Sequence, residues 1–167
     1  WGFGIGAAVA HRGTLLGSSL GRFGEIGHLP SPGGAGRRCA CGARGCLETE
    51  AALWALAPRL HRRLGSLPDG EEELAAALAA PDVADLPEVR AATRAMQHGL
   101  VTIHRLFYPD EVLLAGPLAE NPAVFRLLAE GFASGLPEYA VGKTALTTLP
   151  GGLSACRTRS AGPLLRD

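Results

Sequence analysis

Four metal-binding side chains lie close together between positions 28 and 46, and they constrain this chain more than any other feature. They are His28, Cys39, Cys41 and Cys46. One histidine with three cysteines is a common ligand set of closed, tetrahedral zinc sites. The connecting loop contains prolines and glycines that allow the sharp turns needed for the four side chains to converge: Pro30, Pro32 and the glycines 33, 34, 36, 42 and 45. The sequence therefore predicts a structural zinc loop.

The thiols allow two other interpretations. Free cysteines are common in protein cores, so the three could be unrelated. A disulfide is the second alternative, but three cysteines leave one unpaired, and Cys39 and Cys41 are too close in sequence to bridge without strain. The fourth cysteine, Cys156, stands far from the others beside Arg157 and is interpreted as a free thiol rather than a fifth ligand.

Composition limits the function classes. The 167 residues are enough for one domain with a sizeable core. The chain has 16 basic and 16 acidic residues, which removes any general electrostatic case for nucleic-acid binding. The pair Arg37-Arg38 is interpreted as a solvated pair that offsets the negative charge of the thiolates. No apolar run reaches the roughly 18 to 20 residues of a membrane helix, and no leader opens the chain, so a cytoplasmic location without membrane contact is expected.

The amino-terminal third is expected to hold a hairpin and the metal loop. Small residues alternate with Phe3, Ile5 and Val9, which indicates a buried strand, and residues 11–13 supply a turn before a returning strand at 14–16. Because the buried pattern starts at the first residue, we expect this chain to be a fragment. Residues 17–46 should be irregular.

The middle of the chain is expected to be helical. A helix is predicted from Glu48, because leucines recur at three- and four-residue steps, and Pro58 should kink or divide it. Asp69 and Glu72 resemble a capping box that opens a helix through Ala80, followed by a linker at 81–87. A long amphipathic helix is predicted over 88–106, with one apolar face: Val89, Ala92, Met96, Leu100 and Ile103. His98 and His104, on this helix, are interpreted as surface or packing residues.

The last third should alternate strands and helices. The continuous apolar run 111–115 indicates a strand buried on both faces. Asn121-Pro122 supplies an N-cap and a first-turn proline for a helix to about Ser134. A further strand is expected at 145–149 and a terminal helix from 161. This order predicts an α/β fold with a sheet packed by helices.

Three runs in the metal loop resemble the signature of the ROK family, bacterial proteins named for repressors, open reading frames and sugar kinases. They are Glu25-Ile26-Gly27-His28, Cys39-Ala40-Cys41-Gly42 and Gly45-Cys46-Leu47-Glu48. Residues 1–13 also resemble the family's glycine-rich hairpin, and 109–116 its later proline-to-strand segment. The resemblance covers nearly the whole chain, but only the second half of a family member.

The resemblance implies an actin-like ATPase (ribonuclease H-like) fold, in which two α/β lobes are hinged over a cleft. Residues 1–167 would be mostly the C-terminal lobe, with the zinc loop at 24–48, and the upstream lobe and any DNA-binding domain would lie outside this chain. The resemblance also implies that Glu25, His28 and Glu48 hydrogen-bond sugar hydroxyls, with His28 binding zinc through its other ring nitrogen. The alternative for the two glutamates is loop solvation or helix capping.

The family contains sugar kinases and sugar-responsive transcriptional regulators. Its kinases usually show Gly-Thr-Gly-x-Gly, with the threonine donating to phosphate, where this chain has Phe3 between Gly2 and Gly4, followed by Ile5 and Gly6. They commonly show Gly-Gly after the later strand, where this chain has Ala115-Gly116-Pro117. Alanine is only a small change, but proline lacks a backbone donor. The nucleotide-side residues Gly4, Gly6 and Gly116 thus stand in eroded motifs, while the sugar and zinc residues are intact.

This mixed pattern favours the sugar-binding effector region of a regulator, with no catalytic residue in this chain. The alternative is the C-terminal half of an ATP-dependent, glucokinase-like sugar kinase, which would require ATP and Mg²⁺, and a third possibility is a purely structural zinc module. A homo-oligomer, dimer or tetramer, is expected, for which helix 88–106 offers a face that can equally serve the core. DNA would be bound only through a domain outside the chain. Glucose, xylose and N-acetylated amino sugars all present hydroxyls to the same glutamates.

Overall fold

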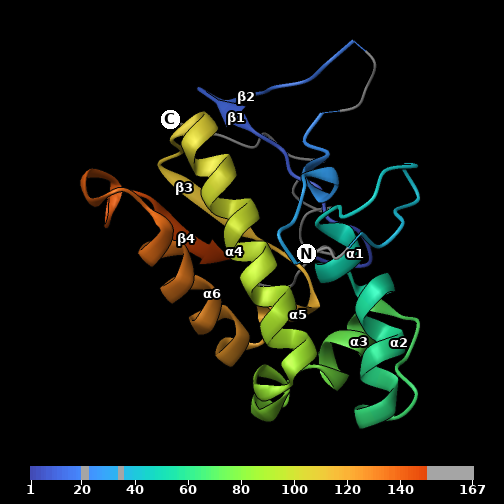
Figure 1. Ribbon diagram of the computed structural model, residues 1–167. Coiled ribbons are helices and arrows are strands. Elements are labelled where there is room, and N and C mark those ends of the chain that lie inside the picture. Colours follow the sequence, from blue (N-terminus) through green and yellow to red (C-terminus); the bar gives the residue numbers. More distant parts are fainter. Residues whose placement is uncertain (20–22, 34–35, 150–167) are drawn as a thin grey trace.

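The computed structural model describes residues 1–19, 23–33 and 36–149. Helix α4 runs through the middle of the molecule, with α6 and the β3–β4 sheet on one side and α1, α2 and α3 on the other (Figure 1). The elements in chain order are β1 (Ala10–His11), β2 (Thr14–Leu15), the 3-10 helix η1 (Ile26–His28), α1 (Glu48–Ala51), α2 (Leu53–Leu64), α3 (Glu71–Ala77), η2 (Pro81–Asp85), α4 (Pro87–Phe107), β3 (Glu111–Leu114), α5 (Pro117–Glu120), α6 (Pro122–Gly135), η3 (Glu138–Ala140) and β4 (Ala145–Thr148).

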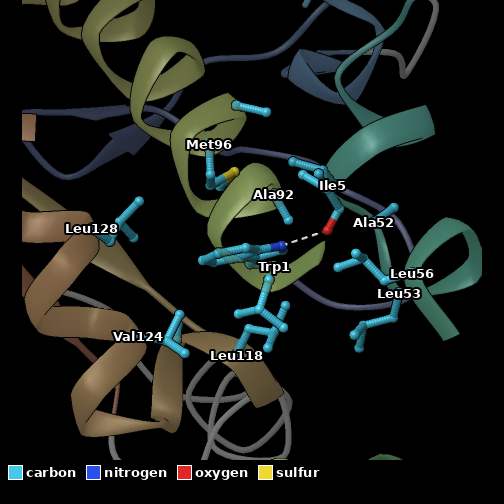
Figure 2. Close-up of a cluster of buried hydrophobic side chains, with 14 of the residues drawn as sticks. Trp1, Ile5, Ala52, Leu53, Leu56, Ala92, Met96, Leu118, Val124 and Leu128 are labelled. Carbon is cyan, nitrogen blue, oxygen red and sulfur yellow. Dashed lines mark hydrogen bonds between the residues drawn. The ribbon is translucent and has the colours of Figure 1, made fainter. Parts of the chain in front are cut away.

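Helix α4 forms as its apolar periodicity predicts, within one residue at each end. All five residues of its predicted apolar face are buried, so this face serves the core of the chain itself. Trp1 lies in the same cluster, between α4, α1 and α6, and its indole Nε1 donates to the Ala51 carbonyl at 2.7 Å (Figure 2). The hydrophobic core therefore connects the first residue of the chain with helices from its middle and its last third.

The amino-terminal hairpin is confirmed, but the strand predicted from Phe3 is wrong. Only Ala10–His11 pairs with Thr14–Leu15, in an antiparallel register. The backbone of residues 2–7 bonds to two other segments instead of one neighbouring strand. Leu53 N, at the start of α2, donates to Gly2 O, while Gly27 N donates to Ile5 O and Ala7 N donates to Gly24 O. This segment therefore ties α2 to the metal loop.

The helix after Glu48 divides at Ala52 and not at Pro58. Ala52 is extended, with φ −71° and ψ 147°, and Pro58 lies inside α2. The division occurs there because the Leu53 N–H leaves the helical pattern and donates to Gly2 O at 3.0 Å. A contact between residues so far apart in sequence is not visible in the local pattern.

The predicted capping box and linker also differ from the structure. The N-cap of α3 is Gly70 and makes no side-chain cap hydrogen bond, so Asp69 is not the cap. Helix α3 ends at Ala77, before the predicted end at Ala80. The linker contains the 3-10 turn η2, which packs against α4 and α6.

Strands β3 and β4 form where predicted and pair in parallel, with Glu111 opposite Ala145. The expectation that the first of them is buried on both faces is wrong: only Leu114 is buried, and Leu113 is 51% exposed. Within the described ranges β3 pairs with β4 alone, so one face and one edge of this strand lack a covering layer.

Helix α6 begins as predicted at Asn121, whose side chain accepts from the Ala123 and Val124 N–H groups. The predicted terminal helix from 161 and Cys156 lie outside the described residues. Among the residues that the structure describes, no helix combines the length and apolar character needed to cross a membrane.

Candidate functional site

The predicted metal ligands converge. The ligand atoms of His28, Cys39, Cys41 and Cys46 all lie within 4.8 Å of one another. The Cys39 Sγ is 3.6 Å from His28 Nδ1, and the Cys41 Sγ is 3.6 Å from the Cys46 Sγ. Zinc bond lengths of about 2.0–2.3 Å give tetrahedral edges of roughly 3.5–3.8 Å, so these two separations fit ligands of one zinc ion. The 3.6 Å sulfur separation exceeds the roughly 2.05 Å of a disulfide.

Backbone pairing within the loop produces this convergence. An antiparallel bridge joins Arg38 to Arg44, and Cys39 N donates to Ala43 O at 2.9 Å, so two of the cysteines sit on one tight turn. Gly42 and Gly45 adopt φ values of 95° and 74°, in the left-handed region that favours glycine. The glycines of the signature therefore set the shape of the turn. Figure 1 places this loop beside α1.

The thiols differ in their acidity. Burial raises the pKa of the Cys46 thiol to about 12, and its neighbours Cys41 and Cys39 act in the same direction. A hydrogen bond from the Ala43 backbone lowers the pKa of the Cys41 thiol. Because a metal binds the thiolate, an ion entering this cluster must displace a proton from Cys46 at neutral pH.

The structure brings Glu25 and Glu48 to opposite nitrogens of the His28 ring. His28 Nε2 is 3.6 Å from the Glu25 Oε2, and Nδ1 is 4.0 Å from the Glu48 Oε2. The side chain of Glu48 is 16% exposed, whereas those of His28 and Glu25 are 33% and 60% exposed. Since Nδ1 also faces Cys39, the ring can bind a metal at Nδ1 and present Nε2 to a ligand. Glu25, Glu48 and His28 thus combine two carboxylate acceptors with one ring nitrogen on an accessible surface.

The glycine before His28 lets the backbone approach Glu48. A Cβ atom on Gly27 would lie 2.5 Å from both the Glu48 Cγ and the Ile5 carbonyl oxygen. Ile5 N donates to the Glu48 Oε1 at 3.1 Å, which fixes the carboxylate from the other side. Glu48 is therefore held between the amino-terminal segment and the Glu-Ile-Gly-His turn.

The three glycines that we expected on the nucleotide side have different neighbours. A Cβ on Gly4 would meet the Glu48 Oε1 at 3.2 Å, and one on Gly116 would meet the Trp1 carbonyl oxygen at 2.2 Å. A Cβ on Gly6 would lie 4.0 Å from Gly24 O. Phe3, which the family resemblance sets at the position of the kinase threonine, is 46% exposed.

The structure adds Glu50, which the sequence pattern did not indicate, to the surroundings of the metal loop. Its side chain is buried, and its Oε2 accepts from Ser31 Oγ at 2.9 Å. The sequence feature that could have indicated it is a second glutamate two residues after Glu48. An α-helix points the side chains of two such residues in different directions. His98 is exposed, and His104 is buried with its Nε2 3.0 Å from Thr144 Oγ1, so both are surface or packing residues, as predicted.

Comparison with known proteins decides the family. The family model described as ROK family matches residues 2–148. The chain belongs to the ROK family. A kanosamine kinase from Amycolatopsis mediterranei is 32% identical over 165 residues, which is 93% of this chain and 51% of the kinase. A glucokinase from Halalkalibacterium halodurans is 39% identical over 56 residues, or 34% of this chain and 17% of that protein. The chain thus spans at most about half the length of these ROK relatives.

Solved structures of ROK proteins share the fold. A hexokinase from Thermus thermophilus matches with a TM-score of 0.70 and 29% identity, over 90% of this chain and 52% of that one. A transcriptional regulator, a homologue of the E. coli MLC protein, matches with a TM-score of 0.72 and 23% identity, over 88% and 39%. A Streptomyces griseus glucokinase in complex with glucose and AMPPNP matches with 0.65 and 23%, over 87% and 53%. The ROK neighbours have the actin-like ATPase fold, and this ROK chain is α/β.

Proposed function

We propose that the chain is the sugar-binding effector region of a ROK-family transcriptional regulator. The observation that carries the proposal is the placement of Glu25 and Glu48 within 4.0 Å of the two nitrogens of one histidine ring. Carboxylates accept two or more hydroxyl hydrogen bonds each, so this group suits a ligand rich in hydroxyls. In this proposal Glu25, His28 and Glu48 bind the sugar.

Zinc is the proposed metal of the cysteine cluster. Bound there, the ion fixes the tautomer and orientation of His28 and closes the loop that carries Glu25. A loop that is ordered before the sugar arrives loses less conformational entropy on binding. The metal would therefore have a structural role and would also support sugar affinity.

The eroded nucleotide side supports a sensor over an enzyme. Phe3 cannot donate a hydrogen bond to a phosphate, and Pro117 has no backbone donor. We place the chain in the C-terminal lobe of a longer, cytoplasmic protein that forms a dimer or tetramer, with the other lobe and a DNA-binding domain upstream. Sugar would shift the equilibrium between open and closed lobes through its differential affinity for the two states.

A sugar kinase is the second candidate, because the kanosamine kinase is 32% identical over 93% of this chain. In that case the chain would supply the sugar contacts, and the catalytic aspartate and first phosphate loop would lie upstream. ATP and Mg²⁺ would then be required.

Calorimetry on the full-length protein tests the proposal. Titrating hexoses, xylose and amino sugars should give a binding heat that Glu25→Gln reduces at least about tenfold in affinity, as expected when a charged hydrogen-bond partner is lost. The control, Glu130→Gln on the exposed face of α6, should bind as the wild type does. No ATP-dependent sugar phosphorylation should be detected. Turnover would establish the kinase, and the absence of any sugar binding would leave only the structural zinc module.

A further inference from the structure

We propose that Glu50 is a positioning residue of the metal and sugar site, which fixes the arm of the loop that carries His28. The inference rests on the function proposed above and deepens it. None of the contacts described for Glu50 involves a candidate metal ligand; its carboxylate contacts Ser31 and the Gly33 backbone instead.

The Glu50 carboxylate is built into the loop. Its side chain is 7% exposed, although an unpaired carboxylate is costly to bury. Ser31 Oγ donates to its Oε2 at 2.9 Å. A Cβ atom on Gly33 would lie 2.3 Å from Oε1 and 2.4 Å from Oε2, so the carboxylate lies directly against the Gly33 backbone. These contacts hold one point of the loop to α1.

The held segment continues directly into the metal site. Leu47 N donates to Leu29 O at 2.8 Å, and Ser31 N donates to Gly45 O at 2.8 Å. An antiparallel bridge pairs Pro30 with Cys46 between these two bonds. The arm that follows His28 therefore runs beside the arm that carries Cys46, and Glu50 holds its far end. If that end detaches, two metal ligands on neighbouring arms lose their fixed separation.

The charge of Glu50 also has a local partner. Arg59 Nη2 donates to the Glu50 backbone carbonyl at 2.9 Å. Burial lowers the pKa of the Arg59 guanidinium, Arg37 lowers this pKa further, and the negative charge of Glu50 opposes both effects. A glutamine at position 50 would keep an amide oxygen that can accept from Ser31, but it would lose this charge.

The short helix α1 thus carries two carboxylates with different tasks. Glu48 faces His28 and is held by the Ile5 N–H, whereas Glu50 faces Ser31 and Gly33. Loss of Glu50 would leave all four metal ligands and both sugar-binding glutamates in the chain. What would be lost is the order of the loop before binding, so zinc should be released faster and the sugar should bind more weakly.

The test uses Glu50→Gln and Ser31→Ala in the full-length, zinc-loaded protein, with Glu130→Gln as the matched control. Each test variant should release zinc to a chelator about tenfold faster and bind sugar about tenfold more weakly, as expected for one lost charge-assisted hydrogen bond. The double variant should be less impaired than the sum of the two single variants, because both changes weaken the same Ser31–Glu50 contact. The Gly33→Ala variant should behave in the same way, and Gly17→Ala, where a Cβ meets nothing within 4 Å, should not.

Zinc release and sugar affinity within twofold of the wild type in Glu50→Gln and Ser31→Ala would overturn the proposal. A purely structural role would also overturn it, and would appear as a melting temperature lowered equally with and without zinc at unchanged sugar affinity. Ser31→Ala removes only a hydroxyl, so it decides the matter if Glu50→Gln does not fold. If the wild type binds zinc but no sugar, the sugar proposal fails, and the rate of zinc release still decides the role of Glu50.

Discussion

At the scale of single residues, the proposed sugar site depends on a glycine as much as on its carboxylates. Gly27 has the Ile5 carbonyl and the Glu48 side chain on either side of the space that a Cβ would fill. The carbonyl belongs to the backbone and is itself bonded to the Gly27 N–H, so it cannot move aside easily. Any added methyl group must therefore displace Glu48.

We predict that Gly27→Ala weakens sugar binding by at least about tenfold, within the range of roughly 1–3 kcal/mol for overpacking. Isothermal calorimetry measures the affinity, and Gly17→Ala is the control because a Cβ there has open space. Zinc stoichiometry should stay at that of the wild type, since the three atoms nearest to a Cβ on Gly27 belong to Glu48 and Ile5 and not to a cysteine. Unchanged sugar affinity would show that Glu48 does not bind the ligand.

The two nitrogens of His28 predict a division between metal and sugar effects. Nδ1 lies 3.6 Å from the Cys39 Sγ, and Nε2 lies 3.6 Å from the Glu25 Oε2. The variant His28→Ala should lower zinc affinity at least about tenfold and abolish sugar binding, because it removes a ligand and a sugar contact. Glu25→Gln should lower sugar affinity alone. Chelator competition and calorimetry measure the two properties separately, and loss of zinc in Glu25→Gln would contradict the assignment of the nitrogens.

At the scale of secondary structure, Asn121 joins two elements by a single buried side chain. Its Oδ1 accepts from Ala123 N at 2.9 Å and Val124 N at 3.2 Å, which caps α6. Its Nδ2 donates to Leu78 O and Ala80 O, at 2.7 and 3.0 Å, after the end of α3. Only an amide supplies acceptors and donors together in this shape.

We predict that Asn121→Asp destabilises the chain as much as Asn121→Ala does, by about 2–4 kcal/mol. Aspartate is as good an N-cap as asparagine, but here it would place a carboxylate against two carbonyl oxygens. Urea unfolding followed by circular dichroism measures the free energies of unfolding. A near-wild-type Asn121→Asp would mean that only the cap matters and that the bonds to residues 78 and 80 contribute nothing.

The elements that sequence predicted well are those determined by neighbouring residues. Helix α4 follows from its apolar periodicity, and the start of α6 follows from Asn121-Pro122. The division at Ala52 was missed because it depends on Leu53 N donating to Gly2 O, a partner far along the chain. The exposure of β3 was missed because an apolar run does not show whether a second layer is present.

The same distinction holds for the candidate site. The convergence of the four candidate ligands was predictable because three cysteines and a histidine in a glycine-rich loop have few other uses, and the structure brings them together. The sequence does not show which nitrogen of His28 faces the cysteines, because this depends on how the two arms of the loop fold. Glu50 was missed because a carboxylate in a helix is usually solvated, and only its packing against Ser31 and Gly33 distinguishes it.

At the scale of the whole molecule, the chain consists of a helical core and a loop that has little apolar packing of its own. The core cluster includes Trp1, Leu53, Met96 and Leu128 on four different parts of the chain. In the loop, Cys39 and Cys46 are buried, but Arg37, Arg38 and Arg44 are exposed. The loop backbone is instead held by a few hydrogen bonds and, in our proposal, by zinc.

This contrast predicts how the molecule responds to metal removal. Stripping zinc with a chelator should speed amide hydrogen exchange at Cys39, Gly42 and Gly45, which donate to other loop carbonyls, by about tenfold or more. Amides in the middle of α4 should exchange at an unchanged rate, because the core that covers them contains no metal ligand among its clustered residues. Hydrogen exchange with mass spectrometry resolves the two regions, and adding zinc back should restore protection in the loop. If α4 lost protection together with the loop, metal binding would be coupled to folding of the entire chain, and the division between core and loop would be wrong.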